Sequence, residues 1–379
     1  MNAGAPISRV TLLCLFALTV SACSADDSHS QQEAESRLAF ANWAGEIGAT
    51  TIEDFERTHG IEVDEEVISD NVVLQTKLLT GNSGSDVVVP TANFLPPLIA
   101  AGALTPLDRS KLPNWRNLDP GVLKQLEALD PGNRYAIPYV WGTYGITYDS
   151  RAAKAALGHD PGSGYELLFD VNTVKAMAPC GIAWPDGGGM VMTSLALLSA
   201  GIDPSTQRVE DLKSAETLLM RVRPYVRYID SSKYDGDLAS GEICVAAGPS
   251  GDMLRARDAA ATGPRPRELR YLVPSTVGLM WIDVLVIPAA APHSESAYRF
   301  MNYLLDPAVM AGVTNGAKFA NAVPSSIDLL DPAIRGDADI RPPPEVIARL
   351  RVMPEEKKDF VRERTRMWTR VRLGRPSHE

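Results

Sequence analysis

Residues 40–47 read Phe-Ala-Asn-Trp-Ala-Gly-Glu-Ile, and the organisation of the chain can be followed outward from them. Apolar and small residues lead into Asn42 and Trp43, and an amphipathic helical pattern comes directly after. A strand that ends in an indole and opens a helix places that ring at the carboxyl edge of a sheet, where open α/β folds bind ligands. Trp43 beside Glu46 would suit an organic cation through cation–π contact and charge pairing. The alternative is that Trp43 caps a hydrophobic core.

Short apolar runs alternate with amphipathic helical segments after this stretch. The pattern predicts strands at residues 38–42, 61–67 and 86–90, and helices at 49–59 and 72–79. Gly60 is well placed to stop the first helix. Strands and helices in this order predict a mainly parallel sheet with helices on both faces.

The length of 379 residues exceeds what one compact core usually holds, so two lobes are expected. The extended aromatic segment 135–148 predicts a crossover into the second lobe, and residues 278–288 predict the return. Two crossings between two α/β lobes make a hinged cleft. The predicted boundaries are 38–141 for lobe 1, completed by about 283–326, and 142–282 for lobe 2, completed by about 327–375.

The composition is that of an ordinary soluble globular protein, with 45% hydrophobic and 22% charged residues. The formal net charge of −10 argues against a nucleic-acid partner and is compatible with a cationic ligand. From Arg341 onward, 11 Lys/Arg face 6 Asp/Glu, which predicts a solvated helix face that pairs with acidic surface elsewhere.

The N-terminus has the pattern of an export signal. Arg9 precedes a short apolar run at residues 10–20, and Ser21, Ala22 and Cys23 follow. The run is too short to span a bilayer. It resembles a bacterial lipobox, which implies that residues 1–22 are removed, that Cys23 carries lipid and that 23–37 form a flexible tether. An ordinary signal cleaved nearby is the alternative.

Two cysteines remain for the folded part of the chain. Cys14 leaves with the signal and Cys23 is lipidated, so Cys180 and Cys244 face an oxidising envelope compartment. A structural disulfide is favoured there, with two buried free thiols as the alternative.

Catalytic motifs are largely absent. The sequence has no Gly-x-Ser-x-Gly elbow, Walker A loop, His-Glu-x-x-His motif or zinc-type Cys/His spacing, so neither an enzyme nor a cofactor is expected. One glycine-rich loop, residues 187–189, precedes a helical pattern. It is either a flexible turn or a cradle for an anion at a helix N-terminus.

Two carboxylates near predicted strand ends carry more weight. Asp252 follows a turn after the Cys244 strand, and Asp283 lies in an otherwise apolar run. An unpaired buried charge is costly, so Asp283 should face a cavity or a partner. Either an Arg or Lys pairs with it, or Asp252 and Asp283 hold an ammonium group from the two sides of a cleft.

Several blocks of sequence match one family: residues 42–43 (Asn-Trp), 86–90 (Asp-Val-Val-Val-Pro), 106–113 (Pro-Leu-Asp-Arg-Ser-Lys-Leu-Pro), 117–120 (Asn-Leu-Asp-Pro), 237–246 (Asp-Leu-Ala-Ser-Gly-Glu-Ile-Cys-Val-Ala), 302–305 (Asn-Tyr-Leu-Leu) and 364–369 (Arg-Thr-Arg-Met-Trp-Thr). From about Leu38 to Arg372, the chain resembles the periplasmic polyamine-binding proteins of ABC importers, particularly the putrescine-binding branch. The resemblance implies an α/β, two-lobed, type II periplasmic binding protein fold that closes over its ligand, and it supports a Cys180–Cys244 bridge.

The resemblance also implies a set of ligand-binding residues: Trp43, Thr91, Ser231 or Ser232, Asp252, Trp281, Asp283 and Phe319, with Phe319 in place of a usual Tyr. Other positions depart from the family pattern. Ala44, Gly45 and Glu46 replace a polar and aromatic run, Gly189 aligns with a pocket Glu, and Pro249 with a pocket Trp. Glu46 is a candidate replacement for the missing aspartate. These losses argue against tight putrescine binding of the ordinary kind and leave a longer, bulkier or carboxylate-bearing amine.

The resulting expectation is a monomeric, lipid-anchored receptor that delivers a polyamine or related cation to an ABC permease. The alternative is a sensor that captures the same ligand for a signalling receptor.

Overall fold

The computed structural model describes residues 1, 36–68 and 70–375. The predicted signal peptide, the lipidation site at Cys23 and nearly all of the predicted tether lie outside this part. Within it, every helix is too short or too polar to cross a membrane.

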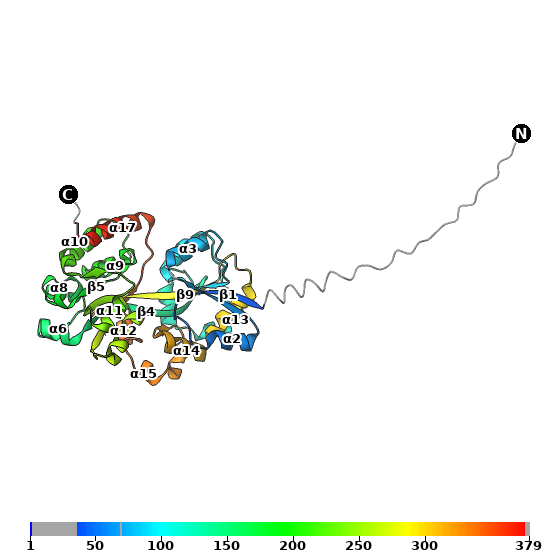
Figure 1. Ribbon diagram of the computed structural model, residues 1–379. Coiled ribbons are helices and arrows are strands. Elements are labelled where there is room, and N and C mark those ends of the chain that lie inside the picture. Colours follow the sequence, from blue (N-terminus) through cyan, green and yellow to red (C-terminus); the bar gives the residue numbers. More distant parts are fainter. Residues whose placement is uncertain (2–35, 69, 376–379) are drawn as a thin grey trace.

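Two lobes lie side by side, and two long strands run between them (Figure 1). These strands, β4 (Ala136–Asp149) and β9 (Gly278–Val286), pair with each other in antiparallel fashion. Together they join the outer strands into one sheet of order β2-β1-β3-β9-β4-β7-β5-β6. The outer strands pair in parallel, as predicted. The crossing strands are antiparallel because the chain leaves along one and returns along the other.

The first lobe contains β1 (Arg37–Trp43), α2 (Thr51–His59), β2 (Glu62–Ile68), α3 (Asn71–Leu79), β3 (Val87–Val88), α4 (Leu95–Ala100), α5 (Pro120–Leu126), α13 (Ser294–Leu304), α14 (Pro307–Ala317) and β10 (Ala320–Asn321). The second contains α6 (Ser150–Leu157), α7 (Glu166–Phe169), α8 (Val171–Met177), β5 (Ile182–Trp184), α9 (Met190–Ser199), α10 (Asp211–Val222), β6 (Tyr228–Ile229), α11 (Tyr234–Ser240), β7 (Val245–Pro249), α12 (Ser250–Thr262), β8 (Leu269–Leu272) and α17 (Lys358–Leu373). Short segments that link them are α15 (Pro332–Arg335), α16 (Pro344–Ile347) and β11 (Leu350–Val352).

The opening strands and helices follow the predicted order. β1 ends at Trp43, and α2 ends at Gly60, whose φ of 66° allows its N–H to donate to the Glu56 carbonyl. In the predicted strand 61–67, Ile61, Val63 and Val67 alternate as the expected buried face, and this prediction is wrong for Val67, which is 59% exposed. β2 is the edge strand of the sheet, so little packs against it.

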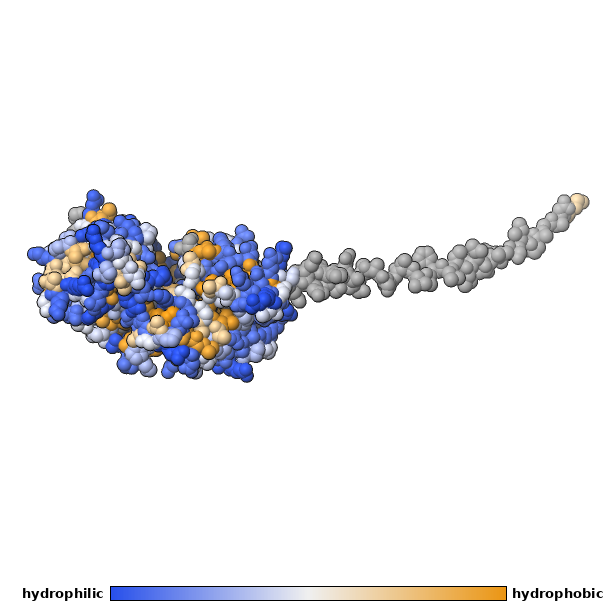
Figure 2. Space-filling view, turned by 60° about the horizontal axis from the view of Figure 1, so that its bottom comes forward, coloured by the Kyte–Doolittle hydropathy of each residue, from blue (hydrophilic) through white to orange (hydrophobic). Residues whose placement is uncertain are grey.

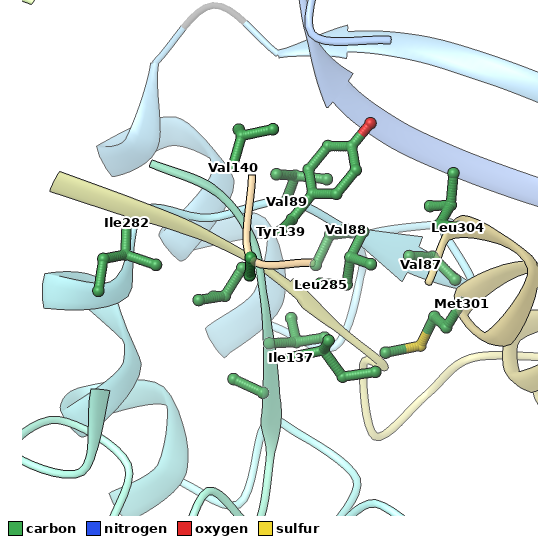
Figure 3. Close-up of a cluster of buried hydrophobic side chains, with 14 of the residues drawn as sticks. Val87, Val88, Val89, Ile137, Tyr139, Val140, Ile282, Leu285, Met301 and Leu304 are labelled. Atoms are coloured by element: carbon green, nitrogen blue, oxygen red, sulfur yellow. The ribbon is translucent and has the colours of Figure 1, made fainter. Parts of the chain in front are cut away.

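The core of the first lobe forms around β3, β4 and β9. Val87, Val88 and Val89 are fully buried, as expected for a strand covered on both faces. Figure 3 shows these valines in one cluster with Ile137 of β4 and Met301 of α13.

Three groups of buried side chains bear on the predicted lobe boundaries, which remain a prediction. One group comes mainly from residues 38–141 and 280–350. A second comes mainly from residues 146–247 and 353–371. The third joins side chains from residues 183–271 to Ala311 and to side chains from residues 330–340. Figure 2 shows a largely hydrophilic surface with a notch between the two lobes.

The basic C-terminal helix pairs with acidic side chains, as predicted. Arg370 of α17 forms an ion pair with Glu216 of α10 at 2.6 Å, and Arg364 forms one with Glu356 at 2.6 Å. These contacts hold the end of the chain on the second lobe.

Cys180 and Cys244 form a disulfide, which excludes the free-thiol alternative. The bridge joins the turn before β5 to the residue before β7 and closes a loop with a sequence separation of 64.

Replacing both cysteines with Ala is expected to lower the free energy of unfolding by about 3–4 kcal/mol, because the unfolded chain regains the entropy of that loop. Denaturation in urea of the oxidised chain, with Met177→Leu as a packing control beside the bridge, measures the change. Equal midpoints for the double variant and the wild type would contradict the expectation.

Candidate functional site

All eight predicted ligand residues line one cavity of about 460 Å³ between the lobes. They are Trp43, Glu46, Thr91, Ser231, Asp252, Trp281, Asp283 and Phe319. The first three follow strands of the first lobe, Ser231 and Asp252 belong to the second, and Trp281 and Asp283 lie on the crossing strand β9. That these side chains bind a ligand stays a prediction, but the fold gathers them from six separate regions of the chain.

The floor of the cavity is a pair of buried carboxyl groups. Glu46 is 7% exposed and Asp283 is 4% exposed, and their side chains hydrogen bond to each other. Burial, and then the neighbouring Asp283, holds the pKa of Glu46 well above its usual range. Burial also raises the pKa of Asp283 to about 7. The pair therefore holds a proton near neutral pH when no cation is nearby.

The carboxyl pair has unused hydrogen-bonding capacity. Glu46 Oε2 and Asp283 Oδ1 are buried and have no hydrogen-bond partner among the described residues. In the same part of the chain, no Lys or Arg forms an ion pair with Asp283, so the proposed structural partner for this residue is not found. Buried acceptors without donors are what an incoming ammonium group would satisfy.

Trp43 forms a fixed wall beside this pair. Its indole N–H donates to the Val89 carbonyl at 2.8 Å, which holds the ring in place. The ring also packs against the hydrophobic core of the first lobe. Trp43 therefore contacts the core with one part of its surface and lines the cavity with another, which combines the two alternatives considered for it.

Thr91 extends the same wall and is held by Asn71. The Asn71 amide donates to Thr91 Oγ1 at 2.9 Å, and the Thr91 N–H donates back to Asn71 Oδ1 at 3.1 Å. The Thr91 hydroxyl also hydrogen bonds to Asp283. Asn71 was not identified from the sequence, because it opens a helix with no polar pattern of its own.

Asp252 is the residue that has a basic partner. Arg255 lies one turn later on α12 and donates to Asp252 Oδ1, while the Tyr234 hydroxyl donates to Asp252 Oδ2 at 2.6 Å. Asp252 was predicted as a free ammonium ligand, and its partners Arg255 and Tyr234 were not predicted. The i, i+3 spacing of Asp252 and Arg255 on a helix was the signal that could have revealed the ion pair.

Tyr144 of β4 was also missed and lies between the two acidic positions. Burial, followed by Asp283 and Asp252, raises the pKa of its phenol above the usual range, so the group stays neutral. Tyr144 belongs to the aromatic crossover segment, so the sequence alone does not distinguish it from the core residues around it.

The structure distinguishes between the two predicted serines, Ser231 and Ser232. Ser231 lines the cavity and its Oγ accepts from the Asp186 N–H at 2.9 Å, whereas the Ser232 hydroxyl donates to Asp230. Of the two serines, Ser231 is therefore the one at the site.

The glycine-rich loop at residues 187–189 does not line the cavity. The Gly188 carbonyl accepts from Arg364, and Gly189, at φ 82°, leaves room for the Trp368 ring where a Cβ would overlap it. The loop therefore packs against α17, which does not support the alternative that its amides hold an anionic ligand group.

Phe319 links the two lobes at the edge of the cavity. Its ring lies edge-on to Trp281, with centroids 4.7 Å apart, and packs so closely on Gly251 that a Cβ there would overlap the ring. Gly251 lies in the first turn of α12, directly before Asp252.

Replacing Gly251 with Ala is expected to displace the Phe319 ring and lower ligand affinity at least about tenfold, because the two walls no longer meet. Gly236→Ala on α11 is the matched control, since a Cβ there meets nothing within 4 Å. Calorimetric titration and thermal melting of both variants measure the effect. An unchanged affinity for the Gly251 variant would show that this contact is not part of closure.

Comparison with known proteins places this geometry in a family. The family model for bacterial extracellular solute-binding proteins matches residues 50–342. The putrescine-binding periplasmic protein SpuD of Pseudomonas aeruginosa is 39% identical over 339 residues, which cover 89% of this chain and 92% of SpuD. The putrescine-binding periplasmic protein PotF of Escherichia coli is 37% identical over 340 residues, with 89% of this chain and 92% of PotF covered.

A solved structure has the same fold. The crystal structure of the spermidine/putrescine ABC transporter substrate-binding protein PotD from Streptococcus pneumoniae matches with a TM-score of 0.77 at 24% identity, over 90% of this chain and 99% of PotD. The type II two-lobed fold is thereby confirmed. The chain belongs to the family of bacterial extracellular solute-binding proteins.

Proposed function

We propose that this protein is an extracytoplasmic receptor that captures a polyamine or a related organic cation and delivers it to an ABC importer. The observation that carries the proposal is the buried Glu46–Asp283 pair, which lines a cavity beside Trp43 and keeps two oxygens without a hydrogen-bond partner among the described residues. An ammonium group placed there would donate charge-assisted hydrogen bonds to the carboxylates and contact an indole ring. The names of SpuD and PotF as putrescine-binding proteins support the same ligand class.

Closure of the two lobes would couple binding to transport. The cavity walls come from both lobes, and β4 and β9 connect them, so a ligand that contacts both walls stabilises the closed form. A permease that recognises the closed form would then receive loaded receptor in preference to empty receptor. A binding role of this kind requires no catalytic group, in keeping with the relatives named as binding proteins.

Location and assembly are part of the proposal. The relatives named periplasmic proteins support export of this chain, and the N-terminal sequence pattern supports removal of residues 1–22 and lipid attachment at Cys23. The receptor would act as a monomer tethered by that lipid.

Calorimetric titration of the chain beginning at Ala25 tests the proposal. The ligands are diamines, spermidine, spermine, agmatine and amino acids, each at the same pH and salt concentration. We expect binding of at least one cationic amine. Heat from a neutral or anionic solute alone, with none from any cationic amine, would refute it.

A further inference from the structure

The cavity is electrically asymmetric. At its floor, Glu46 and Asp283 have buried free acceptors and no basic partner among the residues described. Elsewhere in its lining, Asp252 is already paired with Arg255. After burial and Asp283, these two charges also act on the pKa of Glu46, which Asp252 raises and Arg255 lowers. Within the part of the chain that the structure describes, one pair of carboxyl groups lacks a basic partner and the other carboxylate has one, so the cavity suits a ligand with two different polar groups.

We propose that Arg255 receives the far end of the ligand, so that the cavity selects a primary amine carrying a carboxylate over a diamine of equal length. This inference rests on the proposed capture of an organic amine and adds a specificity to it. The ammonium group lies on the Glu46–Asp283 pair, and the carboxylate lies on the Arg255 guanidinium.

A second ammonium group would gain little at the Asp252 end. Asp252 Oδ1 accepts from Arg255 and Oδ2 accepts from Tyr234 at 2.6 Å, so both oxygens already have a donor. To reach Asp252, the ammonium would also approach a guanidinium of the same charge. Like charges at short range oppose binding, and the cost grows as water is excluded on closure.

A carboxylate would find a suitable group at the same place. A guanidinium has five N–H donors, and within the described residues the hydrogen bonding of Arg255 consists of the one bond to Asp252. Its side chain is 51% exposed, which leaves room for it to turn toward a ligand. Asp252 lies in the first turn of α12, where the helix dipole favours negative charge, and Arg255 follows in the second turn.

Titrations with ligand pairs of matched length test the inference. The pairs are 4-aminobutanoate with 1,4-diaminobutane, and 6-aminohexanoate with 1,6-diaminohexane. We expect the wild type to bind the amino acid of a pair more tightly. Arg255→Gln should weaken the amino acid about ten- to a hundredfold and should not weaken the diamine, because one charge-assisted pair is lost for the first ligand only.

Two further variants keep the result interpretable. Arg255→Lys retains the charge without the fork of donors, so it should weaken the amino acid less than Arg255→Gln does. Arg265→Gln makes the same charge change at an exposed residue beyond the end of α12 and should bind both ligands as the wild type does. Thermal melting confirms that each variant is folded.

Each other outcome overturns a defined part of the reasoning. If the wild type prefers the diamine and Arg255→Gln leaves that preference unchanged, the role of Arg255 is refuted and the proposed amine capture stands. If neither ligand of any pair binds, and polyamines do not bind either, the proposed function and this inference both fail.

Discussion

Asp283→Asn is expected to lower the affinity for the cationic ligand by at least about thirtyfold while leaving the protein folded. The substitution keeps the size of the side chain and removes the charge that faces the ammonium group. Loss of one partner of a buried, hydrogen-bonded charge pair costs about 2–5 kcal/mol in binding, which corresponds to roughly thirty- to several-thousandfold in affinity.

The ligand-free variant should be at least as stable as the wild type near pH 8. In the wild type, burial raises the pKa of both carboxyl groups, and Asp283 raises that of Glu46 further, so removing the Asp283 charge relieves a cost of burial. A binding residue of this kind therefore differs from a structural one, whose loss would lower affinity and stability together. Calorimetric titration and thermal melting separate the two cases.

Asp64→Asn is the matched control for this experiment. It makes the same charge change at an exposed position on the edge strand β2, away from the cavity lining. Its affinity should equal that of the wild type. If Asp283→Asn also binds the ligand normally, the carboxyl pair is not the ammonium site.

Ligand affinity should increase with pH between about 5 and 7, by up to tenfold per pH unit for each proton released. Burial places the pKa of Asp283 at about 7 and that of Glu46 well above its usual range, so the pair is protonated at low pH. A protonated carboxyl does not attract an ammonium group, and the ammonium itself stays charged throughout this range. Binding must therefore release a proton until the pH exceeds the pKa of the free pair.

The same shift has the opposite effect on the stability of the free protein. The folded state binds more protons than the unfolded state between the ordinary carboxyl pKa, about 4, and the raised value near 7. This pair therefore lowers the free energy of unfolding as pH rises through that window. Bound cation should cancel the loss, because it stabilises the ionised pair.

Calorimetry in buffers of different ionisation enthalpy counts the released protons. Glu46→Gln should reduce the number released and flatten the pH profile, whereas Asp64→Asn should leave the profile as it is. A constant affinity from pH 5.5 to 8, with no exchange of protons, would contradict the proposed protonation of the pair.

Local features of the fold could be predicted from the sequence to a useful extent. The period of apolar residues predicted β1, α2 and α3, and Gly60 correctly marked the end of α2. The buried valines of β3 were predicted from their continuous run. The exposure of Val67 was not predicted, because it depends on the position of β2 at the edge of the sheet. The order of strands in a sheet cannot be inferred from the local spacing of apolar residues.

The membership of the candidate site was predicted in part, and its internal contacts were not. Trp43, Asp252 and Asp283 could be named from strand ends and from family resemblance, and all three line the cavity. The sequence could not say that Asp252 pairs with Arg255 while Asp283 faces Glu46. Nor could it show that the glycine-rich loop at residues 187–189 packs against α17 and does not line the cavity.

The sequence by itself therefore determined the family, the two-lobed α/β fold and the residue types that gather at the cleft, because these depend on local pattern and on matched blocks of residues. Only the tertiary structure decided which charges meet, since ion pairing depends on distances of a few ångströms between groups from separate parts of the chain. Glu46 and Asp283 are 237 positions apart, and their contact follows from how β1 and β9 are placed in one sheet. That placement turns two ordinary carboxylates into a buried pair that a cation would satisfy.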